Sequence, residues 1–217
     1  GCGRVSSRHI DALSLRVPGA KVAAVCDIVE ERAEKYGTAL NAPFFTSSED
    51  MYKSIDLDVV SIATPSGDHY QRAIEALSYG KHVVVEKPIA LRLEHVDELI
   101  KMAGKTNRKL WVIHQNRYNP ALVKAKEVLD SGRIGKLVAG TVRVRWCRTQ
   151  SYYDGDDWHG TWEMDGGVLS QQAIHHIDAL RWFMGPVESV YAKCETSLVD
   201  MECEDISIAK IRFANGA

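Results

Sequence analysis

The sequence lacks the features that mark several specialised classes of protein. No apolar run approaches the roughly 18 residues that a membrane-spanning helix needs. Lysine and arginine total 27 against 29 aspartates and glutamates, so the net charge of -2 gives no electrostatic case for a nucleic-acid or membrane partner. Repeats, low-complexity segments and flexible linkers are also absent. With 45% hydrophobic and 26% charged residues, the composition is that of an ordinary globular protein.

Cysteines are few and form no metal-binding or disulfide pattern. The five are odd in number, include no C-x-x-C pair, and stand at Cys2, Cys26, Cys147, Cys194 and Cys203. A disulfide framework and a zinc site are therefore disfavoured. We expect a reducing compartment, the cytoplasm.

The first part of the chain alternates short apolar runs with helical patterns. The runs predicted to be buried strands are 21–27, 58–63, 82–85 and 110–114. Apolar residues recur at helical spacing at Tyr70, Ala73, Ile74 and Leu77, and at Leu93, Val96, Leu99 and Ile100. Strands that alternate with helices need crossover connections, so residues 1–117 are predicted to be an α/β domain with a doubly wound parallel sheet.

The pattern changes after residue 118. Asn119-Pro120 forms a good N-cap and first-turn pair for a helix that stops at Ser131-Gly132. Strand-like runs follow at 137–147, 186–196 and 205–213, and a helix over roughly 167–183 separates the first two. Strands in succession predict that residues 118–217 form an α+β domain with a mainly antiparallel, open sheet.

Segments are expected to be missing from both ends of the sequence. A glycine-rich turn like that at Gly1 needs a strand before it, and the last run breaks off at Asn215-Gly216, a turn signal with no return strand. We therefore predict that the first strand of the parallel sheet and the end of the antiparallel sheet are missing. This piece alone should be poorly stable and inactive.

The opening hexapeptide Gly1-Cys2-Gly3-Arg4-Val5-Ser6 fits the pattern G-x-G-x-x-G/A loosely. Gly1 permits a tight turn, Gly3 lets the backbone approach a pyrophosphate, and Ser6 is small enough for helix–strand packing. The N-terminus of the next helix supplies N–H groups and a positive dipole. The pattern favours a dinucleotide-binding turn, with a plain turn as the alternative.

Asp27 ends the next expected strand. An acid at this place bonds the adenine ribose hydroxyls and repels a 2′-phosphate. Ile28 follows where an arginine would favour NADP, although Arg32 lies nearby. NAD is therefore predicted in preference to NADP, with a solvated strand-end acid as the alternative.

Two more groups follow strands at the edge where ligands of doubly wound sheets bind. Ala63-Thr64-Pro65 follows the run 58–63, where Ser66 and Asp68 could instead simply cap a helix. Glu86-Lys87-Pro88 follows 82–85, and Lys87 could hydrogen-bond a substrate hydroxyl, a surface lysine being the alternative. Pro88 keeps Lys87 out of helical geometry, and the bond between them can be cis.

A second cluster lies on the expected helix 167–183. Gln171, His175 and Asp178 fall on one helical face, which suits a positioned general base. A satisfied core histidine is one alternative. A metal site of His175, His176 and Asp178 is another, which is disfavoured because adjacent histidines point apart on a helix.

These motifs occur together in one known family. They are Gly1-Cys2-Gly3 with His9, the strand ending in Asp27, Ala63-Thr64-Pro65 with His69, Glu86-Lys87-Pro88, and the helix 166–178 with His175. On them the chain resembles the glucose–fructose oxidoreductase/inositol dehydrogenase (Gfo/Idh/MocA) family. The resemblance implies a Rossmann domain followed by an α+β domain whose open sheet often oligomerises. It also implies that Lys87 and His175 are the catalytic pair.

One departure from the family concerns Gln171. Many sugar and inositol dehydrogenases of the family carry aspartate there, four residues before the histidine, and an amide cannot accept a proton. The base role then falls to His175 or Lys87. An amide here is similar to the branch that oxidises the 3-hydroxyl of UDP-N-acetylglucosaminuronate. The run from Arg143 to Gly167 also resembles that branch, with His159 where arginine is expected.

The loop before the helix supplies the remaining candidates. Arg145 and Arg148 suit a carboxylate or phosphate, and its aromatic residues, with Tyr153 and Trp158 among them, suit sugar faces or nicotinamide. A polar strand edge with an aromatic-rich loop is the alternative. The residues expected to bind cofactor are Gly1, Cys2, Gly3, Arg4, Val5, Asp27, Ile28, Ala63, Thr64, Pro65, His69, Glu86, Lys87, Gln115, Arg117 and Trp158. Those expected to bind substrate are Lys87, Arg145, Tyr153, Thr161, Gln171 and His175, and no metal ligand is expected.

The predicted activity is NAD-dependent oxidation of a secondary hydroxyl on a sugar or sugar nucleotide, by a homo-oligomer. Oxidation of inositol or a simple sugar is one alternative. A protein that binds NAD(H) as a sensor without turnover, and a metal-dependent hydrolase, are the other two.

Overall fold

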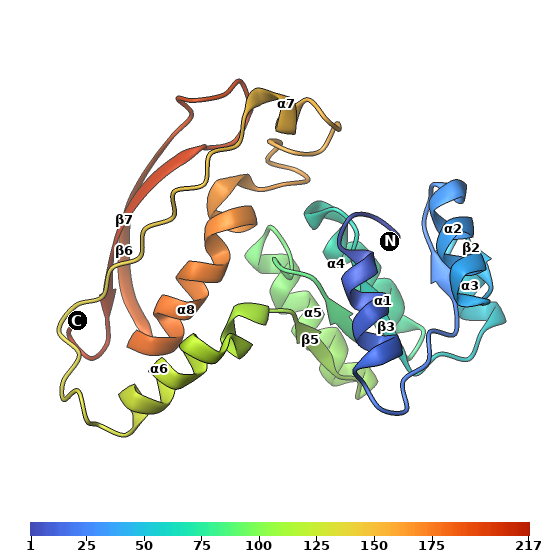
Figure 1. Ribbon diagram of the computed structural model, residues 1–217, viewed down its shortest axis with the longest axis horizontal. Helices are drawn as coiled ribbons and strands as arrows, with labels where there is room; N and C mark the ends of the chain where they lie inside the picture. Colours follow the sequence, from blue (N-terminus) through green and yellow to red (C-terminus); the bar gives the residue numbers. More distant parts are fainter. The chain divides into compact units, whose positions relative to one another are not determined.

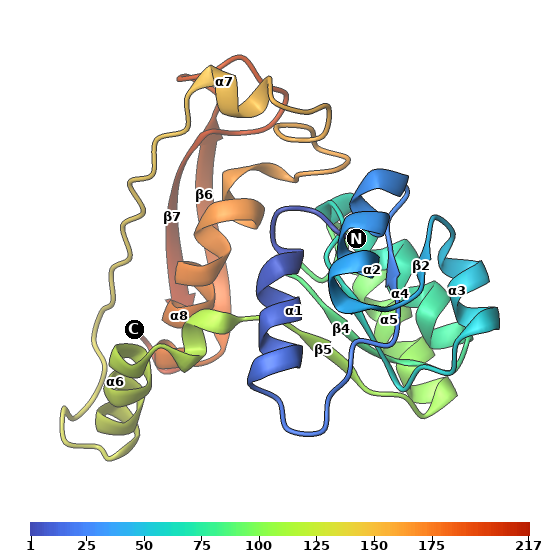
Figure 2. The ribbon, with the colours of Figure 1, turned by 45° about the vertical axis from the view of Figure 1, so that its right-hand side comes forward.

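The computed structural model describes all 217 residues, which form two compact units, Gly1–Ile113 and His114–Ala217. Figure 1 and Figure 2 label most of the helices and strands. None of the helices is both long enough and apolar enough to cross a membrane.

The first unit is an α/β domain. Its helices are α1 (Ser6–Leu15), α2 (Glu30–Leu40), α3 (Ser48–Ser54), α4 (His69–Ser78) and α5 (Leu93–Thr106), with a 3₁₀ turn at Ser66–Asp68. Its strands are β1 (Val25–Cys26), β2 (Phe44–Phe45), β3 (Val59–Ile62), β4 (His82–Val85) and β5 (Leu110–Val112). All pairings are parallel, in the orders β1-β2 and β3-β4-β5. The predicted parallel α/β architecture is confirmed.

Strand β1 is shorter than predicted. The run 21–27 was expected to be extended throughout, but only Val25–Cys26 pairs, with Phe44–Phe45 of β2. The ladder is flanked by a bond from the Val25 N–H to Pro43 O (3.1 Å) and one from the Asp27 N–H to Phe45 O (3.1 Å). A strand is extended only as far as it has a partner, and β2 is just two residues long.

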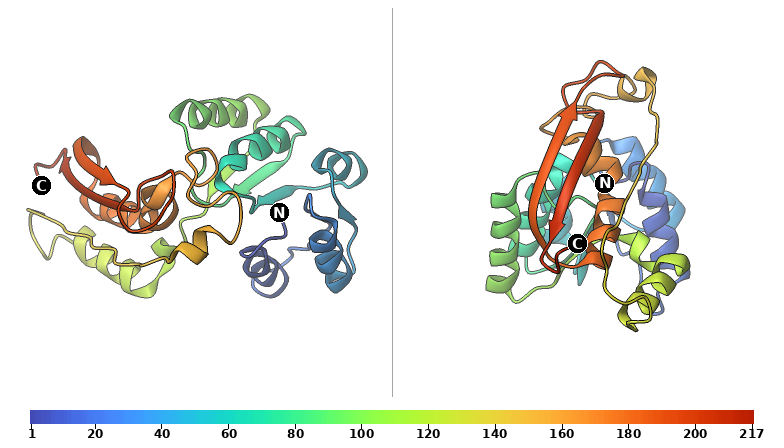
Figure 3. Two further views of the ribbon diagram at one scale, coloured as in Figure 1. Left: turned by 90° about the horizontal axis from the view of Figure 1, so that it is seen from above. Right: turned by 90° about the vertical axis from the view of Figure 1, so that its left-hand side faces the viewer.

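The larger sheet separates two layers of helices. Val60 and Ile62 of β3, with Val83 and Val85 of β4, are buried in one cluster with Leu77 of α4 and Leu99 of α5. Ser61 alternates to the other face, where its hydroxyl bonds to His9 of α1. Figure 3 (left) shows α4 and α5 on one side of β3–β5 and α1 on the other. This is the doubly wound arrangement.

The second unit is an α+β domain. Its helices are α6 (Pro120–Asp130), α7 (Gln150–Tyr153) and α8 (Ile174–Met184), with a 3₁₀ turn at Gln115–Tyr118 and a π turn at Leu169–Ala173. Strands β6 (Val187–Glu195) and β7 (Ile206–Phe213) pair antiparallel, as predicted. Asn119 caps α6 by accepting a bond from the Ala121 N–H (3.0 Å), which confirms the predicted helix start.

The predicted strand over 137–147 is wrong, because this segment has no ladder partner. It packs on α8 instead: a Cβ on Gly140 would lie 2.9 Å from Leu180 Cδ1. Apolar alternation indicates an extended segment, but it does not show whether a neighbouring strand is available to pair.

Candidate active site

The glycine turn lies at the carboxyl edge of the parallel strands. A Cβ on Gly1 would be 2.7 Å from Ala63 O, just beyond β3, so only glycine fits there. A Cβ on Gly3 would meet nothing within 4 Å, which leaves open space beside the backbone. Ser6 closes the turn by donating its hydroxyl to Gly3 O (2.7 Å). Arg4 and Val5 lead directly into α1, whose N-terminus has no side-chain cap.

Asp27 connects this turn to the end of β1. One carboxylate oxygen accepts from the Cys2 N–H (2.6 Å) and the other from the Val29 N–H (2.9 Å), and only 9% of the residue is exposed. A carboxylate has about four acceptor positions, so it can still accept from further donors. The neighbouring Ile28 is exposed.

These residues fit a dinucleotide. An uncapped helix N-terminus with open space beside Gly3 suits an anionic pyrophosphate. Asp27 suits the hydroxyls of a ribose. In addition, the Thr64 hydroxyl is buried at the same edge without a hydrogen-bond partner, as expected of a group that meets a ligand.

Glu86 was expected to bind the cofactor, but its carboxylate contacts another part of the protein. Oε1 lies 2.9 Å from His9 Nε2, and Oε2 accepts from the Lys87 N–H (3.3 Å). Burial acts to raise the pKa of Glu86, but His9 and the Lys87 N–H outweigh it, so this pKa is lower than usual. Glu86 thus ties α1 to the segment that carries Lys87.

His69 was likewise predicted to touch cofactor, and its ring bridges two loops. Nδ1 lies 2.6 Å from Pro88 O and Nε2 lies 3.0 Å from Thr64 O, with the residue 1% exposed. Carbonyl oxygens only accept, so both contacts are hydrogen bonds only when both ring nitrogens carry protons. Burial opposes that charge and lowers the pKa of His69 despite the two carbonyls. His69 therefore joins the Thr64 loop to the Lys87-Pro88 segment, whose peptide bond is cis, as the sequence allowed.

In the second unit, Asp178 was predicted to share a helical face with His175, and its carboxylate binds Arg117. Arg117 donates from Nε (2.7 Å) and Nη2 (2.5 Å), and His114 Nδ1 lies 3.7 Å away. Burial acts to raise the pKa of Asp178, and Arg117 and His114 bring it below its usual value. Arg117, predicted to bind cofactor, thus joins the segment before α6 to α8, and Gln115 nearby is exposed.

The alternative metal site of His175, His176 and Asp178 is not supported. Both oxygens of Asp178 are bound by Arg117, and the ring of His176 packs edge-on against Trp146, with centroids 5.8 Å apart.

Two buried carboxylates accept hydrogen bonds from the start of the helix that carries His175. Asp165 accepts from Gln171 Nε2 (2.7 Å) and from the Gly160 N–H (3.0 Å). Glu204 accepts from the Leu169 N–H (3.0 Å). Glu204 stands 35 residues after Leu169, and no sequence signal pointed to it. Gln171 lies in the π turn, so the spacing of a regular α-helix does not extend back from His175 to Gln171.

The aromatic loop is internally bonded. His159 lies between Asp156 (Nδ1 to Oδ1, 2.6 Å) and the Tyr152 hydroxyl (Nε2 to Oη, 3.0 Å). The ring of Trp158 packs against it at a tilt of 30°, with centroids 3.6 Å apart. Thr161, a predicted substrate contact, donates its hydroxyl to Trp158 O (2.8 Å) and accepts from the Met164 N–H (3.2 Å). These two bonds stabilise the loop.

The predicted substrate residues differ in exposure. Arg145 is exposed, and the neighbouring Arg148 lies over the ring of Tyr152, 5.1 Å from its centroid. Tyr153 is buried at 8% exposure, and burial raises the pKa of its hydroxyl. Lys87, Gln171 and His175 are half-buried.

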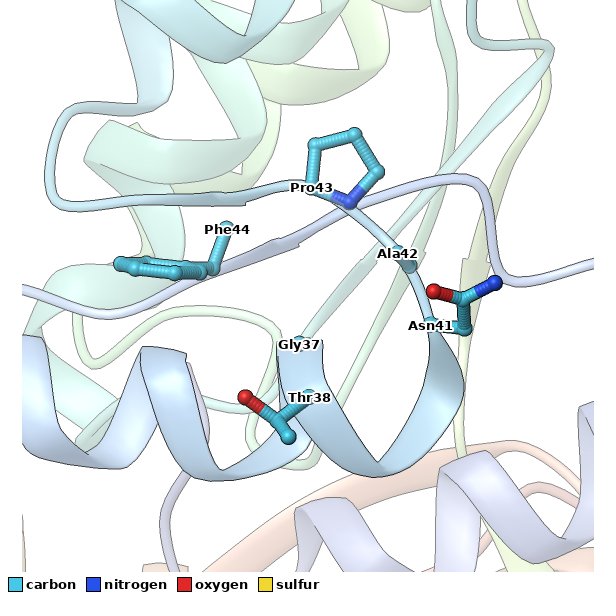
Figure 4. A pocket seen from close by; sticks show the side chains of 6 residues that line it. All are labelled: Gly37, Thr38, Asn41, Ala42, Pro43 and Phe44. Carbon is cyan, nitrogen blue, oxygen red and sulfur yellow. The ribbon is translucent and has the colours of Figure 1, made fainter.

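An open hollow of about 450 Å³ lies elsewhere in the first unit, where α2 ends and β2 begins (Figure 4). The residues that line it are Gly37, Thr38, Asn41, Ala42, Pro43 and Phe44. None of them carries an ionisable side chain, so no acid–base role is assigned to this hollow.

Comparison with solved structures identifies two similar dehydrogenases. The WlbA dehydrogenase from Bordetella pertussis, in complex with NADH and UDP-GlcNAcA, is 40% identical with a TM-score of 0.97, over 100% of this chain and 68% of that one. The WlbA dehydrogenase from Chromobacterium violaceum, with the same two ligands, is 39% identical with a TM-score of 0.97, over 100% of this chain and 63% of that one.

Among curated proteins, the scyllo-inositol 2-dehydrogenase (NAD(+)) of Bacillus subtilis is 31% identical over 190 residues, which are 85% of this chain and 52% of that protein. The chain thus spans about half to two thirds of the length of the relatives it matches. Residues 1–114 match the model of the oxidoreductase family with an NAD-binding Rossmann fold, and residues 122–217 match that of the GFO/IDH/MocA C-terminal domain. The chain belongs to the Gfo/Idh/MocA oxidoreductase family, as its motifs predicted.

Proposed function

We propose that the complete protein is an NAD-dependent dehydrogenase that oxidises a secondary hydroxyl of a sugar nucleotide, the 3-hydroxyl of UDP-N-acetylglucosaminuronate. The observation that carries the proposal is the joining of the glycine turn, Asp27 and Ala63 at one sheet edge. It occurs in a chain about 40% identical, over its full length, to two dehydrogenases solved with NADH and UDP-GlcNAcA.

The cofactor role follows from the chemistry of that edge. The N-terminus of α1 and the backbone of Gly1–Gly3 would hold the pyrophosphate, and Asp27 would accept bonds from the adenine ribose, which favours NAD over NADP. Bound NAD would supply the acceptor for a hydride. Glu86 and His69 act indirectly, by holding the segment around Lys87.

The reaction converts a carbinol to a ketone, so the substrate carbon loses a hydride and its hydroxyl loses a proton. His175 takes that proton, because Gln171 cannot act as a base. Lys87 donates a hydrogen bond to the same oxygen and stabilises negative charge that develops on it. No step assigned to these side chains needs a metal.

Substrate recognition is assigned to the loop before α8. Arg145 is exposed and suits a carboxylate or phosphate, and the rings of Tyr152 and Trp158 suit sugar or nicotinamide faces. The exposed apolar residues of the antiparallel sheet, including Val190, Tyr191 and Ile208, support a homo-oligomer formed through that sheet.

The test uses the complete polypeptide with NAD⁺ and follows the absorbance of reduced cofactor. UDP-N-acetylglucosaminuronate should react fastest, ahead of scyllo-inositol, myo-inositol and simple sugars. Faster turnover of an inositol would instead support the inositol dehydrogenase alternative, which the Bacillus subtilis relative favours. NAD binding without turnover of any substrate would support the sensor. Activity that needs no NAD and is lost with a chelator would support the hydrolase.

Lys87→Ala and His175→Ala should each lower kcat by about 10²–10⁴-fold, the usual contribution of a positioned acid–base group. NADH binding, measured by fluorescence titration, should be retained. Lys101→Ala, which removes an exposed lysine of α5, is the matched control and should leave kcat unchanged. Near-normal turnover in either site variant would contradict the assignment.

A further inference from the structure

Lys87 stands between two residues that are each held by a histidine. Oε1 of Glu86, the residue before it, lies 2.9 Å from His9 Nε2. The carbonyl oxygen of Pro88, the residue after it, lies 2.6 Å from His69 Nδ1. His9 belongs to α1, whereas His69 is the first residue of α4. The backbone on both sides of Lys87 is therefore fixed to helices that start beside the glycine turn or just after β3.

The His9 contact belongs to a longer series of hydrogen bonds. His9 Nδ1 lies 2.8 Å from the hydroxyl of Ser61 in β3, and Glu86 Oε2 accepts from the Lys87 N–H at 3.3 Å. The side chains of His9 and Glu86 are only 14% and 13% exposed. The series thus runs from β3 through α1 to the peptide N–H of Lys87, and little of it is open to solvent.

The partners of His9 determine which of its ring nitrogens donates. Burial acts to raise the pKa of Glu86, but His9 and the Lys87 N–H lower it overall, so the carboxylate is ionised at neutral pH. A carboxylate only accepts, so His9 Nε2 carries a proton. Ser61 suits either charge state of the ring, because a hydroxyl both donates and accepts. The series therefore holds whether His9 is neutral or positively charged.

Helix α1 is also the helix that would meet the cofactor. Its N-terminus has no side-chain cap, and Ser6 at its start closes the glycine turn by donating to Gly3 O (2.7 Å). Such a terminus suits the anionic pyrophosphate. His9 lies about one helical turn after Ser6. The same short stretch of α1 therefore sets both the pyrophosphate site and the position of Glu86.

We infer that His9 is a positioning residue, which fixes the segment Glu86-Lys87 to α1 so that Lys87 is correctly placed against bound cofactor. The inference rests on the proposed function, because it takes Lys87 as the group that hydrogen-bonds the reacting hydroxyl. His9 is assigned no contact with cofactor or substrate and acts through Glu86 and Lys87. A misplacement of about 1 Å in a group that positions substrate can cost about 10²-fold in rate, so its loss should be visible in kcat.

The first test compares two amides at position 9 of the complete protein, with UDP-N-acetylglucosaminuronate and NAD⁺. In His9→Gln the amide nitrogen takes the place of Nε2 and still reaches Glu86. In His9→Asn the shorter side chain takes the place of Nδ1, which faces Ser61, and does not reach Glu86. We expect kcat to fall by about tenfold or more in His9→Asn and by less than about threefold in His9→Gln. NADH affinity, measured by fluorescence titration, should be retained in both.

The second test determines whether the effect passes through Lys87. In a Lys87→Ala background, His9→Asn should lower kcat by less than about twofold further, because the side chain that it positions is gone. A residue that merely stabilises the fold would lower kcat by the same factor in both backgrounds. If His9→Asn does not fold, Glu86→Gln gives the same test, since a single amide oxygen cannot accept from both His9 and the Lys87 N–H.

His82→Asn is the matched control, because it changes a histidine bond at the other end of β4, from the Lys109 N–H to His82 Nδ1 (2.9 Å). It should leave kcat unchanged. Wild-type kcat in His9→Asn would overturn the inference, and so would equal losses in His9→Asn and His9→Gln, or equal losses with and without the Lys87 side chain. Failure of the proposed function is distinguishable, since the wild-type protein would then oxidise no sugar nucleotide.

Discussion

The two units hold their candidate site residues in different ways. In Gly1–Ile113 these residues follow strands of a sheet that has an apolar core. In His114–Ala217 two buried carboxylates accept hydrogen bonds from the start of the helix that carries Gln171 and His175. Val83, Val85 and Leu99 are fully buried in the first unit. In the second, Asp165 and Glu204 are buried, and β6 is exposed along its whole length. The first site is therefore held by non-directional packing, and the second by directional bonds to polar groups.

This difference has a physical consequence. An apolar core tolerates small shifts of side chains at modest cost, whereas a buried carboxylate that loses a donor leaves an unsatisfied group. Geometry in the second unit should therefore respond more sharply to small changes near the helix start. Three changes test the comparison.

The largest effect is expected in the apolar core. Leu99→Ala removes a side chain with 0% exposure and should lower the free energy of unfolding by about 2–5 kcal/mol, measured by urea denaturation. Leu93→Ala, in the same helix at 79% exposure, should change it by less than about 0.5 kcal/mol. Equal losses in the two variants would show that the core of the first unit is not what stabilises it.

The next effect concerns the helix start. At Gly167, where φ is +83°, a Cβ would lie 2.0 Å from Glu204 Oε2. Gly167→Ala should therefore cost about 2–4 kcal/mol, from backbone strain of about 1 kcal/mol and overpacking of about 1–3 kcal/mol. Hydrogen exchange should show this loss at the Leu169 amide.

Gly132→Ala is the matched control, since φ is +71° there and a Cβ would meet nothing within 4 Å. It should show the backbone strain alone. If both variants lose equal stability, the close approach of Glu204 contributes nothing, and the proposed contrast between the units is weakened.

The smallest effect is electrostatic. The pKa of Asp178 is lower in the folded protein than its usual 3.8, so its stabilising contribution is present above that value and is lost as the pH falls through the folded pKa. Asp178→Asn should cost about 1–2 kcal/mol at neutral pH, and the difference from wild type should shrink as the pH falls below about 3.8. Asp157→Asn, in the loop before α8, serves as control in the same denaturation series. A gap between Asp178→Asn and wild type that is independent of pH would show that Arg117 contributes no charge interaction.

The candidate site in the first unit was largely predictable. In a parallel sheet all carboxyl ends meet at one edge, so Asp27, Ala63 and Lys87 could be assigned to that edge from the order of the strands alone. The partners of the polar groups could not be predicted. His9 and Glu86 are 77 residues apart, and nothing in either segment specifies that they meet.

In the second unit the prediction was less complete. The helix and the strands β6 and β7 were expected from periodicity, and the Asn119 cap from local sequence. The prediction of a strand over 137–147 was wrong, and the bond from Arg117 to Asp178 was not predicted. Both cases have one cause: a periodic pattern defines a face, whereas the group that covers that face comes from elsewhere in the chain.

By itself, the sequence determined the glycine turn, the order of acid, lysine and histidine along the chain, and the family, because these depend on local backbone freedom and on strand order. Only the tertiary structure decided that Glu86 contacts His9, that His69 bridges two loops, that Arg117 binds both oxygens of Asp178, and that Gln171 donates to Asp165. A hydrogen bond needs two groups within about 3 Å and in line, and for residues tens of positions apart only the folded chain provides that geometry.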